Sequence, residues 1–178
     1  ERDWGPVSPS PVHPRAFRPG RTGLTGLWMA GPAGSSPRQL SHDAPDAENP
    51  AMTKDGDWGV YSAGRAPSGG LYKVHPDGSG AERLVKSAAI IPDLSPDSRY
   101  ASFINDRNEL RVVRVEDGVV LPFRAVGLAL RASLLQVARP RWSPDMRTLS
   151  ALGQQRGGRL AEYALKFGES PEVVTPRK

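Results

Sequence analysis

The strongest constraint on the fold of this chain is an internal repeat. Three segments are similar to one another. Each has a proline at its second position and a polar turn with an aspartate at its seventh position, and they are residues 49–56, 91–98 and 139–146. A weaker copy occupies residues 5–10. Between the first prolines of the copies (Pro6, Pro50, Pro92 and Pro140) the spacings are 44, 42 and 48 residues. A period of about 40–50 residues is typical of the blades of a β-propeller.

Short apolar segments recur at matching places after each proline. In the second copy they are residues 59–62, 70–74 and 82–85, separated by polar turns that contain arginine or glycine. Within residues 110–115 apolar side chains fall largely at every second position, which is the pattern of a strand. We therefore expect an all-β chain built of four-stranded antiparallel blades. A β-sandwich of short strands is the alternative, and four copies in phase argue against it.

The repeat divides the chain into one propeller region over residues 1–178. Its expected blades have approximate boundaries at 1–44, 45–86, 87–134 and 135–178. Four blades in an arc leave an unpaired sheet face at each end, which proteins rarely leave bare. We therefore expect a partial ring, completed by a partner, by a second copy or by further sequence of a longer polypeptide. A compact four-bladed ring is the alternative.

Composition excludes several other classes of protein. The 178 residues include 19 Gly and 18 Pro, spread along the chain. Each of these costs a helix interior roughly 1–3 kcal/mol, so a bundle of long helices is excluded. The chain has no Cys, which rules out disulfides, a thiolate nucleophile and a zinc ribbon. The net charge of +5 suits anionic partners but is too diffuse to indicate nucleic acid.

Motifs that carry chemistry are missing from the sequence. It has no Gly-x-Ser-x-Gly elbow, no phosphate-binding loop and no His-Glu-x-x-His. The three histidines, His13, His42 and His75, do not follow the period of the repeat. We therefore predict no catalytic residue, no cofactor and no metal site in this chain.

The segment Pro140–Asp145, Pro-Arg-Trp-Ser-Pro-Asp, resembles the WD-like repeat of TolB-type β-propellers. The same repeat occurs in the propeller domains of prolyl-oligopeptidase-like peptidases. The turn at residues 75–80 also fits this family, whereas Ser98 and Met146 stand where it usually has glycine. The resemblance implies a propeller fold and a periplasmic or cell-surface location. It leaves open whether the chain is an accessory scaffold or the propeller portion of a larger peptidase.

The repeated Ser-Pro-Asp motif has an expected structural role in the turn after the first strand of each blade. Proline fixes φ, and a neighbouring aspartate accepts hydrogen bonds from the backbone of its own turn. The residues concerned are Asp55, Ser95, Pro96, Asp97, Ser143, Pro144 and Asp145. The functional alternative, that these carboxylates bind a metal, is disfavoured because the repeat places them about a blade apart.

Arginine is the repeated polar residue outside these turns. Arg21, Arg65, Arg107 and Arg156 each follow, by four residues, the last aromatic or apolar residue of a strand. In an antiparallel blade these turns lie on one face, where the arginines form a basic rim suited to an acidic protein surface. The alternative is that each arginine only braces its own loop.

A long link between the third and fourth blades is expected on the same face. In it Leu128, Arg131 and Leu135 stand at helical spacing, and they either dock a partner or pack on the propeller's own core.

Taken together, these features predict a non-catalytic scaffold that binds other proteins. The partner would be a protein with an acidic surface or a second propeller half. The chain would be an accessory subunit of an envelope-associated or larger complex. A propeller of a larger peptidase, and a propeller whose channel holds a sugar or metal, remain as rivals.

Overall fold

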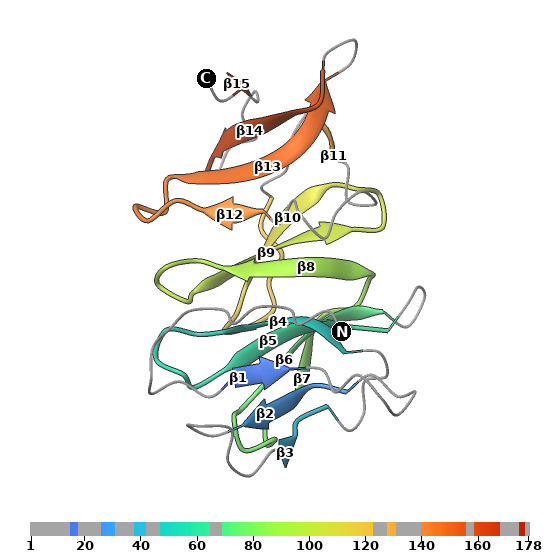
Figure 1. The fold of residues 1–178 in the computed structure, drawn as a ribbon, viewed down its shortest axis with the longest axis vertical. Coiled ribbons are helices and arrows are strands. Elements are labelled where there is room, and N and C mark those ends of the chain that lie inside the picture. Colours follow the sequence, from blue (N-terminus) through green and yellow to red (C-terminus); the bar gives the residue numbers. More distant parts are fainter. Residues whose placement is uncertain are drawn as a thin grey trace.

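A computed structural model describes most of the chain's repeat region. The described residues are 15–17, 26–30, 38–41, 47–64, 69–122, 128–130, 140–155, 159–167 and 175–176. Within these ranges every regular element is a β-strand, and the strands form four antiparallel sheets. Figure 1 shows the sheets stacked one upon another along the longest axis of the molecule.

Each sheet is formed from strands that follow one another in the chain. The first sheet contains β1 (Arg15–Phe17), β2 (Trp28–Ala30) and β3 (Arg38–Gln39). The second contains β4 (Glu48–Met52), β5 (Gly59–Ala63), β6 (Gly70–Val74) and β7 (Glu82–Val85). The third contains β8 (Ala89–Leu94), β9 (Tyr100–Asn105) and β10 (Leu110–Arg114). The fourth contains β11 (Leu128–Leu130), β12 (Arg141–Trp142), β13 (Thr148–Gln155), β14 (Ala161–Lys166) and β15 (Thr175–Pro176).

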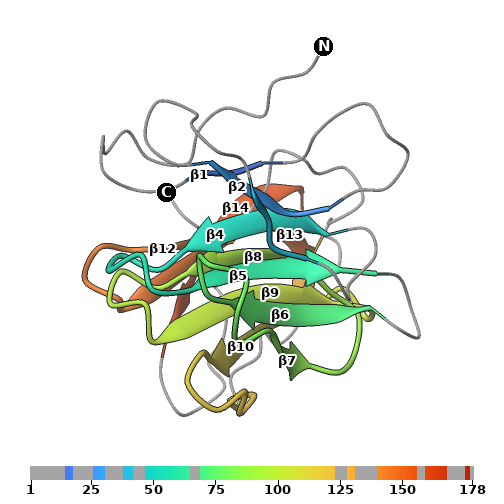
Figure 2. The same cartoon turned by 90° about the horizontal axis from the view of Figure 1, so that it is seen from below.

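The sheets are arranged as blades whose first strands are neighbours. Strand β1 contacts β4, β4 contacts β8, and β8 contacts β12. In Figure 2 the second and third sheets run in the same direction, from β4 and β8 on one side to β7 and β10 on the other. The first and last sheets lie at opposite ends of the stack in Figure 1. The expected all-β architecture of antiparallel blades in an open arc is confirmed.

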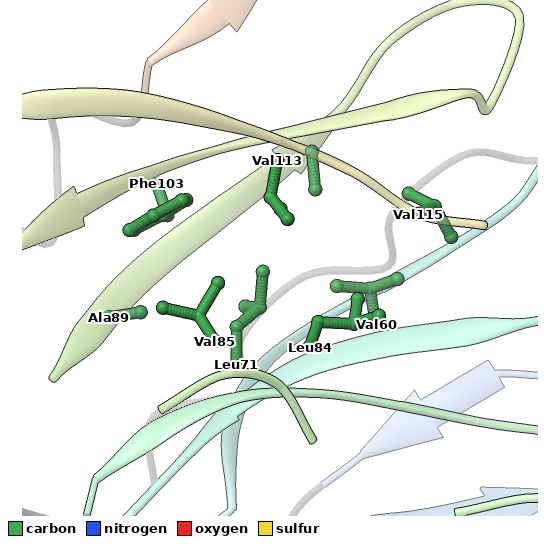
Figure 3. Packing of buried hydrophobic residues seen from close by; sticks show 9 residues of the cluster. Val60, Leu71, Leu84, Val85, Ala89, Phe103, Val113 and Val115 are labelled. Atoms are coloured by element: carbon green, nitrogen blue, oxygen red, sulfur yellow. The ribbon is translucent and has the colours of Figure 1, made fainter. Parts of the chain in front are cut away.

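The core lies between the blades, because a sheet in the middle of the stack is covered on both faces. Along β5, Val60 packs toward the third sheet, whereas the next residue, Tyr61, packs toward the first sheet. Figure 3 shows the cluster between the second and third sheets, where Leu71 from one sheet faces Phe103 and Val113 from the other. This double burial explains why the strand sequences contain apolar residues on both faces of the pleat.

Polar contacts also join neighbouring blades. Lys73 of β6 reaches the third blade, where its Nζ donates hydrogen bonds to the carbonyl oxygens of Val115, at 3.0 Å, and Glu116, at 2.8 Å. The backbone N–H of Lys54 donates to the Ser98 hydroxyl at 2.7 Å. These contacts fix the relative position of the second and third sheets at two separate places.

The fourth sheet departs from the expected boundary at residue 134. Strand β11 pairs with the end of β13, at residues 153–155, and β12 pairs with residues 149–150 of the same edge. In the third sheet one strand, β8, makes both equivalent pairings, with a bulge of one residue between Ile90 and Asp93. The first strand of the fourth sheet is thus split in two, and β11 belongs to the fourth blade rather than the third.

The pairing bears on the helical spacing noted for Leu128, whereas its expected role in docking a partner stays a prediction. Leu128 stands in a strand, because backbone pairing with β13 outweighs the helical spacing of the leucines in this segment. Arg131 and Leu135 lie outside the described residues. In the third sheet the expected fourth strand is reduced to a single bridge, in which Val113 pairs with Val120. Among the described residues, none forms a helix of the length and apolar character needed to cross a membrane.

Candidate functional site

The turns of the blades lie on two opposite edges of the arc. The turns β4–β5, β8–β9 and β12–β13 lie on one edge, at the left in Figure 1. We call this the aspartate edge, after Asp55, Asp97 and Asp145. The turn β9–β10, which carries Arg107, lies on the opposite edge, which we call the arginine edge.

The same pattern of hydrogen bonds recurs in each of the three turns of the aspartate edge. In the third blade the Ser95 hydroxyl donates to Asp97 Oδ1 at 2.6 Å, and the same oxygen accepts from the backbone N–H of Arg99 at 3.1 Å. The Ser95 hydroxyl oxygen in turn accepts from the N–H of Tyr100 at 3.0 Å. The corresponding bonds recur from Ser143 and Asp145 in the fourth blade and from Thr53 and Asp55 in the second. Threonine therefore replaces serine in this network without loss of its hydroxyl contacts.

These hydrogen bonds favour the ionised carboxylates. The Thr53 hydroxyl, helped by the backbone N–H of Asp57, lowers the pKa of Asp55. The Ser143 hydroxyl, followed by the N–H of Arg147, lowers the pKa of Asp145 in the same way. A lowered folded-state pKa stabilises the fold above the ordinary value for aspartate and loses that effect as pH falls through the lowered value. The carboxylates thus act as turn acceptors at neutral pH.

The residue after each aspartate has a left-handed backbone. Its φ is 80° at Gly56, 61° at Ser98 and 60° at Met146. Glycine adopts this conformation without steric cost, whereas a side chain does not. A hydrogen bond explains why a serine stands at position 98: its hydroxyl accepts from the backbone N–H of Lys54 at 2.7 Å. Nothing in the structure explains the methionine.

We predict that Met146→Gly raises the free energy of unfolding by about 0.5–1 kcal/mol, because it relieves the left-handed strain. Ser98→Gly is the matched control, since it relieves the same strain but removes the contact with Lys54, and we expect a smaller gain or a loss. Urea denaturation of both variants measures the difference. An equal gain in both would show that the Ser98 contact contributes nothing.

The three turns meet around an open hollow of about 650 Å³. The residues that line it come from three successive blades: Lys54, Asp55, Pro96, Asp97, Ser98, Pro144 and Met146. The sequence placed the aspartates a blade apart and did not show that their turns border a common hollow. No group of three or more metal-ligating side chains occurs among the residues that the structure describes. The Oδ1 atoms of Asp55 and Asp97, which border this hollow, accept hydrogen bonds within their own turns.

On the arginine edge, Arg107 is exposed at the tip of the β9–β10 turn. This turn is closed by other residues: Asn105 Oδ1 accepts from the N–H of Arg107 at 3.0 Å and from the N–H of Glu109 at 2.9 Å. The Asn105 amide donates to Glu109 Oε2 at 2.9 Å. Within the described part of the chain, the guanidinium of Arg107 makes no hydrogen bond or ion pair. Arg107 therefore contributes its backbone, and not its charge, to bracing the loop.

The other predicted arginines cannot be placed beside it. Arg21, Arg65 and Arg156 lie outside the described residues, so the basic rim stays a prediction at those positions.

A polar contact between the third and fourth sheets was not predicted from the sequence. The Asp93 carboxylate accepts from the N–H of Trp142 at 3.3 Å, and the Asp93 carbonyl accepts from the indole N–H at 3.2 Å. No local signal marks this pair, which is 49 residues apart in the chain.

Comparison by sequence gives no relative: the chain matches no family model and no curated protein. Comparison of structures, in contrast, finds similar proteins. The chain is similar to a putative TolB from Agrobacterium tumefaciens, with a TM-score of 0.68 and 16% identity over 92% of this chain and 59% of that one. It thus spans less than two thirds of that protein's length.

Two further similar structures bear on the architecture. One is the β-propeller domain of the Trilobed protease from Pyrococcus furiosus, which has an open velcro topology. The TM-score is 0.59, with 9% identity over 87% of this chain and 50% of that one. The other is the nidogen/laminin complex, with a TM-score of 0.56 and 13% identity over 80% of this chain and 52% of that one. The stacked sheets and these likenesses show that the chain has the β-propeller fold, in the form found in TolB and in a protease propeller.

Proposed function

We propose that this chain is a non-catalytic β-propeller scaffold that binds other proteins through its arginine edge. The observation that carries the proposal is the state of Arg107. Its turn is closed by Asn105 and Glu109, so the exposed guanidinium is available for an external group. A guanidinium pairs with carboxylates in a bidentate geometry, and an acidic protein surface is the matching partner.

The similar structures support this class of function. A structure of a protein complex, that of nidogen and laminin, is among them, and TolB gives the highest TM-score of the three described above. By its resemblance to TolB-type propellers, the chain would act as an accessory subunit of an envelope-associated assembly, in the periplasm or at the cell surface.

Charge reversal on the arginine edge tests the proposal. We expect Arg107→Glu, combined with Arg65→Glu, to reduce several-fold the proteins captured from an envelope extract by the immobilised chain. The melting temperature should stay nearly unchanged, because exposed substitutions usually alter stability by less than about 0.5 kcal/mol. The matched control is Lys54→Glu, an exposed cation on the aspartate edge, which should leave capture intact. Equal losses of capture and stability in the double variant would mean that the arginines only brace loops.

A second candidate is the propeller portion of a larger peptidase. The likeness to the propeller domain of the Trilobed protease favours it, since the chain spans half of that domain. The complete reading frame distinguishes the two candidates. A hydrolase domain encoded downstream of Lys178 would favour the peptidase, whereas a frame with propeller repeats alone would favour the scaffold.

A further inference from the structure

The hollow on the aspartate edge is lined by side chains of two kinds. The second and third blades contribute the charged residues Lys54, Asp55 and Asp97, and the fourth blade contributes the apolar residues Pro144 and Met146. Its volume of about 650 Å³ lies within the range of about 300–1,000 Å³ that is usual for ligand-binding pockets. A ligand that matches this lining combines an apolar group with a charged one.

The two carboxylates at the hollow each use one oxygen within their own turn and leave the other outside it. Oδ2 of Asp55 accepts no hydrogen bond from any residue that the structure describes. Oδ2 of Asp97 lies 4.0 Å from Nε of Arg99, which is too long for a hydrogen bond. With these two carboxylates and the single ammonium group of Lys54, the lining has a net negative charge and attracts a cation.

The apolar part of the hollow contains a side chain that the turn itself does not require. After the aspartate, the three turns hold Gly56, Ser98 and Met146, all with a left-handed backbone. The two that carry a side chain border the hollow, whereas Gly56 does not. Backbone strain of this kind is frequent at binding sites, and the flexible, polarisable methionine side chain is common at surfaces that bind peptides. The position of Met146 is therefore consistent with a role in contacting a ligand.

We propose that this hollow binds an extended segment of a partner protein in which an aromatic residue stands next to an arginine or a lysine. The aromatic ring packs against Met146 and Pro144, because a thioether makes favourable contacts with a ring. The cationic group pairs with the outer carboxylate oxygens of Asp55 and Asp97. The hollow is open and borders three turns, so it suits a segment that lies across it. It is on the opposite edge from Arg107 and selects the opposite charge.

The chain's methionines provide a direct test. The probe is the peptide acetyl-Gly-Phe-Arg-Gly-amide, titrated into the chain with isotope-labelled methionine methyl groups and followed by NMR. The chain has 3 methionines. Met146 borders the hollow, whereas Met29 and Met52 pack in the core between the first and second sheets. We expect the peptide to shift a single methyl signal in a saturable manner, and this signal is the one that is missing from the spectrum of Met146→Gly.

The peptide and the chain both allow matched controls. A peptide with glutamate in place of arginine should bind several-fold more weakly, because like charges then meet. Asp97→Asn and Asp145→Asn each remove one negative charge and keep an oxygen that can accept the hydrogen bonds of the turn. Since Asp97 borders the hollow and Asp145 does not, calorimetric titration should show several-fold weaker binding for Asp97→Asn alone.

Met146→Gly separates a role in binding from a role in the fold. It should raise the stability of the chain, as argued above, and yet weaken the binding of the peptide several-fold in the same calorimetric titration. Lys54→Glu should strengthen this binding, because it replaces the one cation of the lining with a further carboxylate.

Three results would overturn the proposal. They are the absence of a shift in the Met146 signal at millimolar peptide, equal losses of affinity in Asp97→Asn and Asp145→Asn, and an unchanged affinity in Met146→Gly. Arg107→Glu should leave the shift of the Met146 signal as it is in the original chain. A failure of this site and a failure of the scaffold role at the arginine edge therefore give different results.

Discussion

Phe103→Ala is expected to lower the free energy of unfolding by about 3–5 kcal/mol, the range for truncation of a buried phenylalanine. The side chain is 2% exposed and lies in the cluster between the second and third sheets, with Leu71 and Val113 (Figure 3). Its loss leaves a cavity that the surrounding strands cannot fill, because both sheets are fixed by their hydrogen-bond ladders. Guanidinium denaturation monitored by tryptophan fluorescence measures the change.

The control for this prediction is Val120→Ala. Val120 is 38% exposed and pairs with β10 only through an isolated bridge, so its truncation should cost well under half as much as that of Phe103. A loss of stability for Phe103→Ala no greater than that for Val120→Ala would show that the blades do not depend on this cluster.

The second large effect is expected for Lys73→Met, which should lower the free energy of unfolding by about 2–4 kcal/mol. The lysine side chain is 7% exposed, and its Nζ donates to the carbonyls of Val115 and Glu116 and pairs with Glu82 at 3.0 Å. It also lies 4.8 Å from the centre of the Trp58 ring. Methionine keeps the apolar stem but leaves the two carbonyls without this donor.

Glu82→Gln separates the ion pair from the hydrogen bonds. The Glu82 side chain is 54% exposed, and an ion pair with an exposed partner contributes about 0–1 kcal/mol. We therefore expect a small change in this variant by urea denaturation. If Glu82→Gln cost as much as Lys73→Met, the ion pair rather than the carbonyl contacts would hold the blades together.

The repeat predicted the architecture because the same local pattern is copied in phase. The strands expected at residues 70–74 and 82–85 agree with β6 and β7. In this part of the chain, alternating apolar residues and glycine-containing turns both indicate the same strand limits. The contacts of Lys73 could not be predicted in this way. A lysine in a strand is ordinarily a solvent-facing residue, and its carbonyl partners are 42 and 43 residues away.

The candidate site was less predictable than the fold. Counting residues from each strand located Arg107 at a turn, but only the folded structure shows that the Asn105 side chain, rather than that of Arg107, closes this turn. Period and composition determine where strands begin, whereas the partner of a given side chain depends on the packing of distant segments.

The split first strand of the fourth sheet has a practical consequence for protein engineering. Leu130 pairs with Gly153 and Arg141 pairs with Ser150. Two residues that are eleven positions apart in the chain thus pair with residues only three positions apart on β13. We therefore expect a peptide tag or a fluorescent reporter grafted between these two strands to leave the pairings of β11 and β12 with β13 unchanged.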